Sequence, residues 1–109
     1  MNQVTFVQII SEIGKSFHDP SSAIKFYNEI LAGKNKLGQE ASVCLEMDIV
    51  LETLEMNQPD QAKNILATCK EKLSSISSSE TVVFSKFYQA NAEYRKVNSK
   101  SRLEHFGLS

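Results

Sequence analysis

The residue types that most often perform catalysis are sparse in this sequence. Its two histidines, His18 and His105, are expected in or near breaks between helices, with no nucleophile or ligand motif nearby. Catalysis needs a nucleophile beside a base, or paired titratable groups in a pocket. The segment "AGKNKLG" also lacks the spacing of a phosphate-binding loop and the strand that precedes one. We therefore expect no enzyme activity, no catalytic residue, no cofactor and no small-molecule substrate.

The two cysteines lie in helix-like patterns and do not form a metal-binding motif. Cys44 and Cys69 are twenty-five residues apart, without a Cys-x-x-Cys pair or a histidine close to either. A zinc site needs such clustered ligands, so we expect none. Free cysteines are among the residues most often buried in cores. We expect two buried reduced thiols, and a disulfide between them is the alternative.

Four acidic residues, called the acidic series below, occur at intervals along the third amphipathic segment of the chain. They are Glu46, Asp48, Glu52 and Glu55. Exposed charge usually covers the outer face of a helix, so we expect a solvated face. An acidic ridge that binds a partner is the alternative interpretation.

Basic and aromatic residues gather towards the end of the chain. A candidate basic rim consists of Arg95, Lys96, Lys100 and Arg102. It could contact an acidic partner or only increase solubility. Nucleic-acid binding would need interleaved aromatic residues and a basic domain, whereas the formal net charge here is −1.

Four aromatic residues just before this rim form a second candidate surface. They are Phe84, Phe87, Tyr88 and Tyr94. Aromatic residues of this kind are most often core, and they also dominate interface energetics because they bury large rigid areas. We expect them to form core, or a face that packs against a next repeat or a protein partner.

The overall composition is that of one ordinary folded domain. The chain has 109 residues, of which 41% are hydrophobic and 23% charged. The near-neutral charge gives no global attraction to nucleic acid or anionic membranes. The longest uninterrupted aliphatic run, "IVL", is too short to span a bilayer. The N-terminus resembles neither a secretory signal nor a transit peptide.

Apolar residues recur at helical rather than strand spacing throughout the sequence. We expect five or six helices, over residues 3–17, 20–32, 39–55, 59–74, 80–96 and a short segment 99–106. Asp19 and Pro20 should start the second helix, and Gly33 should end it in the left-handed conformation. Ser77 and Glu80 can form a capping box. The turn "VNSKS" should separate the last two helices.

The third expected helix has two apolar arcs, which indicates that other helices pack on both of its sides. Along the first expected helix, one apolar face should hold Val4, Val7, Ile10, Ile13 and Phe17. In the third helix, Leu45 and Ile49 should be among the most buried residues of the protein.

A repeat of thirty-nine residues relates these helices. Pro20 and Pro59, the two prolines of the chain, are separated by this distance, and Ala23 and Ala62 follow at the same offset. Such a period is typical of helical-hairpin arrays. We predict an all-α, right-handed stack of tetratricopeptide-like hairpins, with repeats at about 3–35, 39–76 and 80–109. Stacked repeats bury one another's faces, so this chain is expected to be a segment of a longer array, with the outer face of its fifth helix uncovered.

Three stretches of the sequence carry a resemblance to a known family. They are "TFVQIISEIGKSFHDPSSAIKFYNEI", "EASVCLEMDIVLETLEMNQPDQAKNILATCKEKLSSI" and "SKFYQANAEYRKVN". Together they resemble the helical-repeat region of the 26S proteasome non-ATPase regulatory subunit 13 family, PCI-domain components of the regulatory lid. The winged-helix PCI module of that family has no counterpart here, and the tail "SRLEHFGLS" departs from its pattern.

The resemblance implies a non-catalytic scaffold in ubiquitin-dependent protein degradation. Its partners would be other proteasome lid subunits, in the cytoplasm and nucleus, without nucleic acid or membrane. The alternative is an independent tetratricopeptide-like adaptor that binds a partner peptide in its groove.

Overall fold

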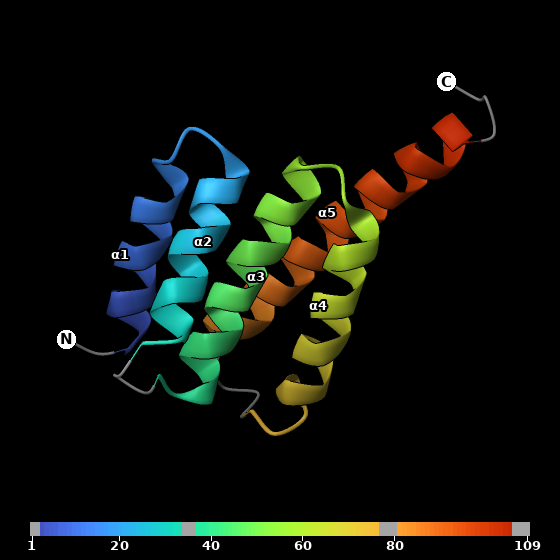
Figure 1. Cartoon of the computed structure of the whole chain (residues 1–109). Helices are drawn as coiled ribbons and strands as arrows, with labels where there is room; N and C mark the ends of the chain where they lie inside the picture. Colours follow the sequence, from blue (N-terminus) through green and yellow to red (C-terminus); the bar gives the residue numbers. More distant parts are fainter. Residues whose placement is uncertain (1–2, 34–36, 77–80, 106–109) are drawn as a thin grey trace.

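The structure, a computed structural model, describes residues 3–33, 37–76 and 81–105. Five helices follow one another: α1 (Gln3–Lys15), α2 (Pro20–Leu31), α3 (Gln39–Glu55), α4 (Pro59–Leu73) and α5 (Thr81–His105) (Figure 1). No strand occurs within these described ranges, so the predicted all-α class is confirmed. The expected capping box at Ser77 and Glu80 lies outside the described residues.

The start of α2 is built as the sequence predicts. Asp19 accepts a hydrogen bond from the Ser22 backbone amide at 2.8 Å, and Pro20 occupies the first helical position. A side-chain acceptor at this place satisfies an amide that has no partner inside the helix. This amide hydrogen bond, followed by one from the Ser22 hydroxyl, lowers the pKa of Asp19. The cap therefore favours the charged carboxylate.

The ends of α2 and α3 differ from each other. The helix α2 ends at Leu31, but Gly33 does not adopt the expected left-handed conformation. Asn57, after α3, does adopt it, with φ of 57°. The Asn57 amide then donates to the Leu54 carbonyl, and the Gln58 amide donates to the Thr53 carbonyl. These are the two hydrogen bonds of a Schellman motif, which closes α3 and turns the chain towards α4.

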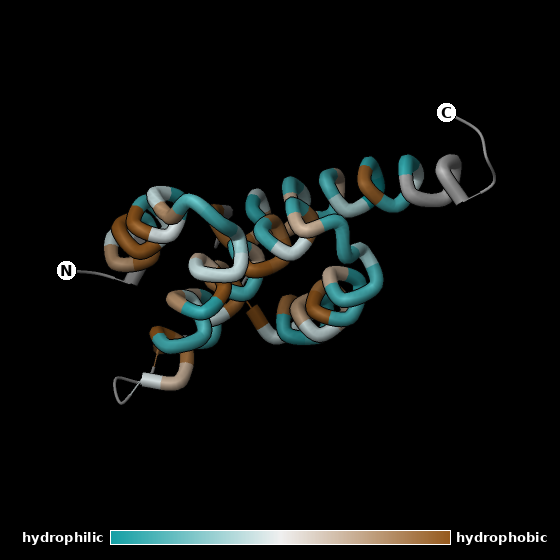
Figure 2. Tube along the Cα trace, turned by 45° about the horizontal axis from the view of Figure 1, so that its top comes forward, coloured by the Kyte–Doolittle hydropathy of each residue, from teal (hydrophilic) through white to brown (hydrophobic). Residues whose placement is uncertain are grey.

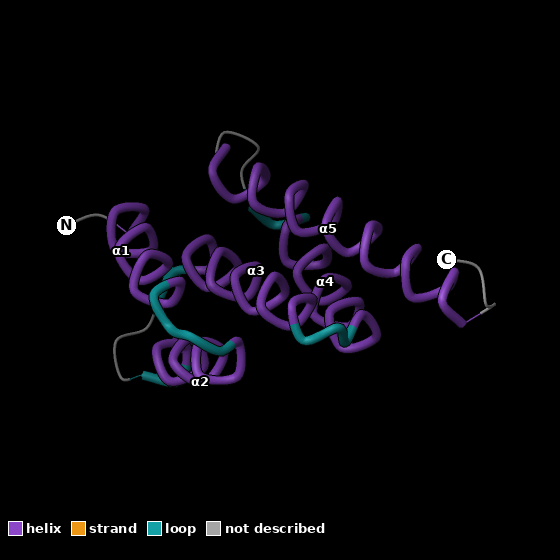
Figure 3. Tube along the Cα trace, turned by 90° about the horizontal axis from the view of Figure 1, so that it is seen from above, coloured by secondary structure: helices purple, strands orange, loops and turns teal. Residues whose placement is uncertain are grey.

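The centre of the protein is α3, which packs against each of the other four helices. Leu45 is fully buried and Ile49 is 6% exposed, as the sequence predicts. Seen from above, α2 and α4 lie on one side of α3, and α1 and α5 lie towards the other (Figure 3). Neighbours on both sides explain why this helix has apolar residues on two arcs.

The packing of α1 against α2 depends on a residue without a side chain. A Cβ atom added at Gly14 would overlap the ring and hydroxyl of Tyr27. Tyr27 is buried, and its hydroxyl donates to the Ser11 carbonyl at 3.4 Å. Glycine costs helix stability relative to alanine, so its presence inside α1 is explained by the close approach of this tyrosine.

The predicted apolar face of α1 is only partly correct. Val7 and Ile10 are buried, but Ile13 and Phe17 are 43% and 40% exposed. The side chain of Val4 lies outside the described residues. The cause is the number of neighbours, because α1 packs mainly on α2 and α3, so the residues on its outer edge have no helix opposite them.

The predicted sixth helix is wrong, because α5 continues through "VNSKS" to His105. The expected pairing of 80–96 with 99–106 is therefore also wrong, and α5 packs on α3 and α4 instead. Lysine favours helices, serine and asparagine are only moderately unfavourable in them, and no glycine or proline interrupts this stretch. Val97 packs against the core, which stabilises the helix at this position.

The described part of the chain is a flat slab of about two helix layers. Its principal extents are 49 × 31 × 18 Å, and the thinnest dimension matches two helices stacked on each other. The second half of α5 projects beyond the other helices (Figure 1) and carries mostly hydrophilic residues (Figure 2). This projection accounts for the long axis of the slab.

Candidate functional site

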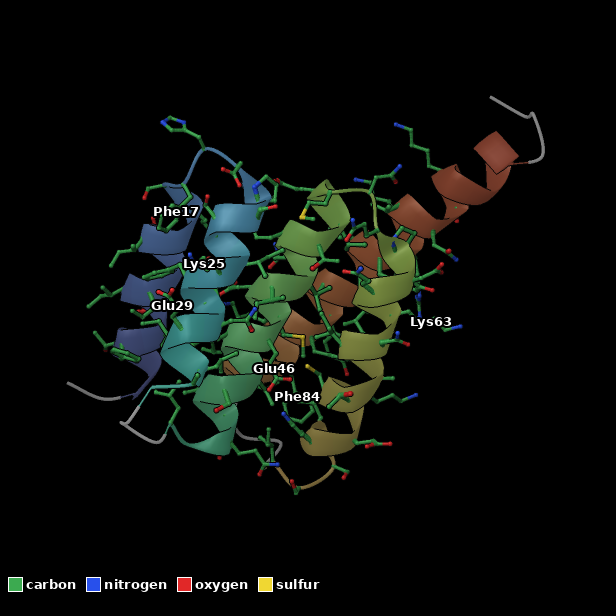
Figure 4. All side chains as sticks on the ribbon, viewed as in Figure 1. Phe17, Lys25, Glu29, Glu46, Lys63 and Phe84 are labelled. Atoms are coloured by element: carbon green, nitrogen blue, oxygen red, sulfur yellow. The ribbon has the colours of Figure 1, made fainter. Side chains whose placement is uncertain are left out.

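The four aromatic residues of the second candidate surface do not share one environment. Phe84, Phe87 and Tyr94 are partly buried and pack against the core, whereas Tyr88 is 68% exposed. Phe84 lies among the helices in Figure 4. The rings of Phe87 and Tyr88 meet edge to face, with centroids 6.1 Å apart. Three residues of this surface therefore contribute to core packing, and Tyr88 is the one that a partner could cover.

The candidate basic rim lies on the projecting half of α5. Arg95, Lys96 and Lys100 are exposed, and the side chain of Arg102 lies outside the described residues. Lys96 approaches Glu93 at 3.9 Å, and both side chains are solvated. Ion pairs of this kind contribute little to stability. The rim is thus available for contacts with another molecule.

The interpretation of the acidic series as one solvated face is wrong. Asp48 is only 4% exposed, and Lys86 donates to both of its carboxylate oxygens at 2.9 Å. The Ser11 hydroxyl donates to the same carboxylate at 2.5 Å. A buried charge needs such partners because removing it from water is costly. The network joins α1, α3 and α5, which are far apart in the sequence.

Glu46, another member of the acidic series, points towards α4 (Figure 4). Lys72 donates to one of its oxygens at 2.6 Å, and the Cys69 thiol donates to the other at 3.4 Å. Burial, and then the charge of Glu46, raises the pKa of Cys69 to about 12. The thiol is therefore neutral and unreactive at physiological pH, since the thiolate is the nucleophile.

The other two acids lie nearer the C-terminal end of α3. Glu55 is exposed and Glu52 is half-buried. Burial raises the pKa of Glu52, with smaller contributions from the charges of Glu55 and Asp48. Only Glu55 therefore has the solvated environment that was expected for the whole series.

The residues considered for metal or redox chemistry stay apart. Cys44 and Cys69 are both buried and do not form a disulfide, as predicted. His18 is exposed in the turn before α2, and the side chain of His105 lies outside the described residues. Within the described ranges, no group of histidines, cysteines and acids could hold a metal ion. In the same ranges, no helix has the length and apolar character needed to cross a membrane.

An open groove of about 770 Å³ runs between α2 and α4, with α3 as its floor. Ile24, Ile49 and Ile65 contribute apolar surface from the three helices. The Ser21 hydroxyl contacts the Met56 sulfur at 3.9 Å at one end, and the Glu46–Lys72 pair lies at the other. No local pattern in the sequence indicates this groove directly, because it depends on how far α3 separates α2 from α4.

Ser11 and Lys86, the partners of Asp48, were not expected from the sequence. The sequence nevertheless contains an indication that Ser11, Asp48 and Lys86 are each polar residues at positions that face the core. Ser11 lies on the core-facing side of α1, Asp48 interrupts an apolar stretch, and Lys86 interrupts an aromatic one. A charge at a core position needs a partner of opposite sign, but only the tertiary structure identifies that partner.

The fold defines a class of protein: an all-α domain whose described part consists of five packed helices. A family model described as PSD13 N-terminal repeats matches residues 1–103. The chain therefore belongs to this family. A search of curated proteins found no match, and a search of solved structures found none either.

Proposed function

We propose that this chain acts as a non-catalytic structural segment of a proteasome regulatory lid subunit. In this role it contributes to ubiquitin-dependent protein degradation through contacts with other lid subunits in the cytoplasm and nucleus. The observation that carries the proposal is the match of residues 1–103 to the family of PSD13 N-terminal repeats. Membership of this family indicates the complex in which the chain would act. The exposed surface of α5 indicates that it would act through contacts with other proteins.

The described surfaces support a role in protein contacts. Tyr88 is an exposed aromatic residue on α5, next to Phe87, which is partly buried. Arg95, Lys96 and Lys100 continue along the same helix and are exposed. An aromatic anchor beside a charged rim is a common arrangement in protein interfaces. The α5 helix is thus the surface that we assign to the contact with a neighbouring subunit.

Co-purification with the lid tests this proposal. We would express the tagged chain in cells, isolate proteasomes through a different subunit, and measure how much of the chain co-fractionates with the lid. We expect the wild-type chain to co-fractionate. Tyr88→Lys should reduce the bound amount several-fold, because it replaces the exposed aromatic residue while leaving the core unchanged.

Lys63→Glu is the matched control for this experiment. Lys63 is exposed on α4 and points away from the other helices (Figure 4). The change should leave co-fractionation at the wild-type level. A folded wild-type chain that stays entirely outside the lid fractions would contradict the proposal. Equal binding by wild type and Tyr88→Lys would contradict the assignment of α5.

A further inference from the structure

The groove between α2 and α4 is a second surface, on a different part of the molecule from the exposed face of α5. Both helices pack on α3 and barely touch each other, so the floor of α3 stays open between them. Ile24 and Ile65 are half-buried on the two walls. Apolar surface in a concave site is typical of places where a ligand binds.

We propose that this groove binds a short extended peptide that is uncharged along its middle and presents apolar side chains to Ile24, Ile49 and Ile65. The groove extends along α3 from Ser42 to Met56. At a rise of about 1.5 Å per residue this distance is about 21 Å. An extended chain covers about 3.3–3.6 Å per residue, so about six residues fit.

The polar residues along the two edges of the groove favour an extended peptide over a helical one. Asn28 on α2 and Gln61 on α4 are exposed and line the groove. A side-chain amide offers both donors and an acceptor. An extended peptide has unpaired backbone groups that these amides can satisfy, whereas the backbone of a helix already satisfies its own.

The charges of the groove favour a neutral ligand with an acceptor at one end. Apart from the Glu46–Lys72 pair, its lining residues are uncharged. Both oxygens of Glu46 already accept hydrogen bonds, one from Lys72 and one from Cys69. The Lys72 ammonium has three donors and is 36% exposed. A backbone carbonyl of the peptide can accept a hydrogen bond there, and a charged residue in the middle would lose its hydration against neutral walls.

A phage-displayed library of random heptapeptides provides the probe for this proposal. We would select it on the immobilised chain, synthesise the most enriched peptide, and measure its affinity by calorimetry. We expect an uncharged sequence with apolar residues in the middle. Ile65→Arg should weaken binding by at least about tenfold, and Asn28→Ala should weaken it several-fold.

Ile13→Arg is the control, because Ile13 lies on the outer edge of α1 and does not line the groove. It should leave the affinity unchanged. Asn28 is exposed, so its variant keeps the test decisive even where Ile65→Arg perturbs folding. Selection of no peptide above background, selection of strongly charged peptides, or equal affinity for wild type and Asn28→Ala would overturn the proposal. A gain of helical circular dichroism by the bound peptide would overturn the extended conformation.

Discussion

Asp48 shows how one side chain can connect three segments of this chain. Its carboxylate accepts hydrogen bonds from Ser11 on α1 and from Lys86 on α5. In the folded protein the carboxylate is almost completely removed from water, while the Lys86 side chain remains 21% exposed. Breaking a buried pair leaves an uncompensated charge, which costs much more than the pair itself contributes.

We predict that Lys86→Met lowers the free energy of unfolding by about 3–5 kcal/mol, because it leaves Asp48 buried without its counter-ion. The double variant Asp48→Leu with Lys86→Met should recover most of this loss, since it removes both charges and adds apolar volume. Urea unfolding monitored by circular dichroism measures both values. Lys96→Ala, which removes an exposed pair with Glu93, should change the stability by less than about 1 kcal/mol. A double variant as unstable as Lys86→Met would contradict the argument.

Leu45 provides a test of core packing at the residue scale. Its side chain is fully buried in the helix that contacts all the others. We predict that Leu45→Ala lowers the free energy of unfolding by about 2–5 kcal/mol, from lost apolar transfer and from the cavity that remains. Ile13→Ala, at a residue that is 43% exposed, should cost about 0.5 kcal/mol. Similar losses for the two variants, measured by urea unfolding, would show that α3 is not the centre of the core.

At the scale of the helices, the turn from α3 to α4 depends on the left-handed conformation of Asn57. The two Schellman hydrogen bonds place Pro59 at the start of α4 directly after this turn. Asparagine and glycine adopt this conformation more readily than other residues. The break that the sequence indicates at "NQP" is thus a specific backbone motif.

We predict that Asn57→Gly keeps or slightly increases the stability, and that Asn57→Val lowers it by about 1–3 kcal/mol, because a β-branched residue is strained at positive φ. Thermal or urea unfolding of both variants against wild type measures the difference. Gly33→Ala is a useful comparison, since Gly33 is not left-handed and its Cβ would approach only the Ile30 carbonyl oxygen closely, at 3.2 Å. If Asn57→Val were as stable as wild type, the motif would not determine the end of α3.

At the scale of the whole molecule, apolar side chains remain exposed at both outer helices. Ile9 and Ile13 on α1, and Phe17 in the turn after it, follow one another at intervals of four residues, and each is about 40% exposed or slightly more. Val82 and Tyr88 are exposed on α5. Aligned apolar residues of this kind mark contact surfaces more often than scattered ones do.

We predict that the isolated chain self-associates at raised concentration and binds a hydrophobic dye, because these two outer surfaces are uncovered. Sedimentation velocity and dye fluorescence measure the two effects. Ile9→Lys with Ile13→Lys should reduce both, since charges then replace these exposed apolar residues on α1. Gln8→Lys, at an exposed polar position of the same helix, should change neither. A monomer without dye binding at all concentrations would show that the exposed residues are not a contact surface.

The sequence by itself determined the helical class, the first four helices within about two residues of their bounds, and the central burial of Leu45 and Ile49. These features follow from local causes: apolar spacing at the helical period, the acceptor of Asp19, and the prolines at the starts of α2 and α4. The buried thiols and the two-sided character of α3 follow from the same pattern.

Only the tertiary structure decided which polar residues are buried and where the surface is open. Asp48 resembles its exposed neighbour Glu55 in the sequence, but Lys86, thirty-eight residues away, makes its burial favourable. The continuity of α5 also depends on tertiary packing, since Val97 contacts the core within a polar stretch that favours a helix only weakly. The groove exists because α3 holds α2 and α4 apart. Pairings and separations of this kind depend on distances between distant segments, which local periodicity does not encode.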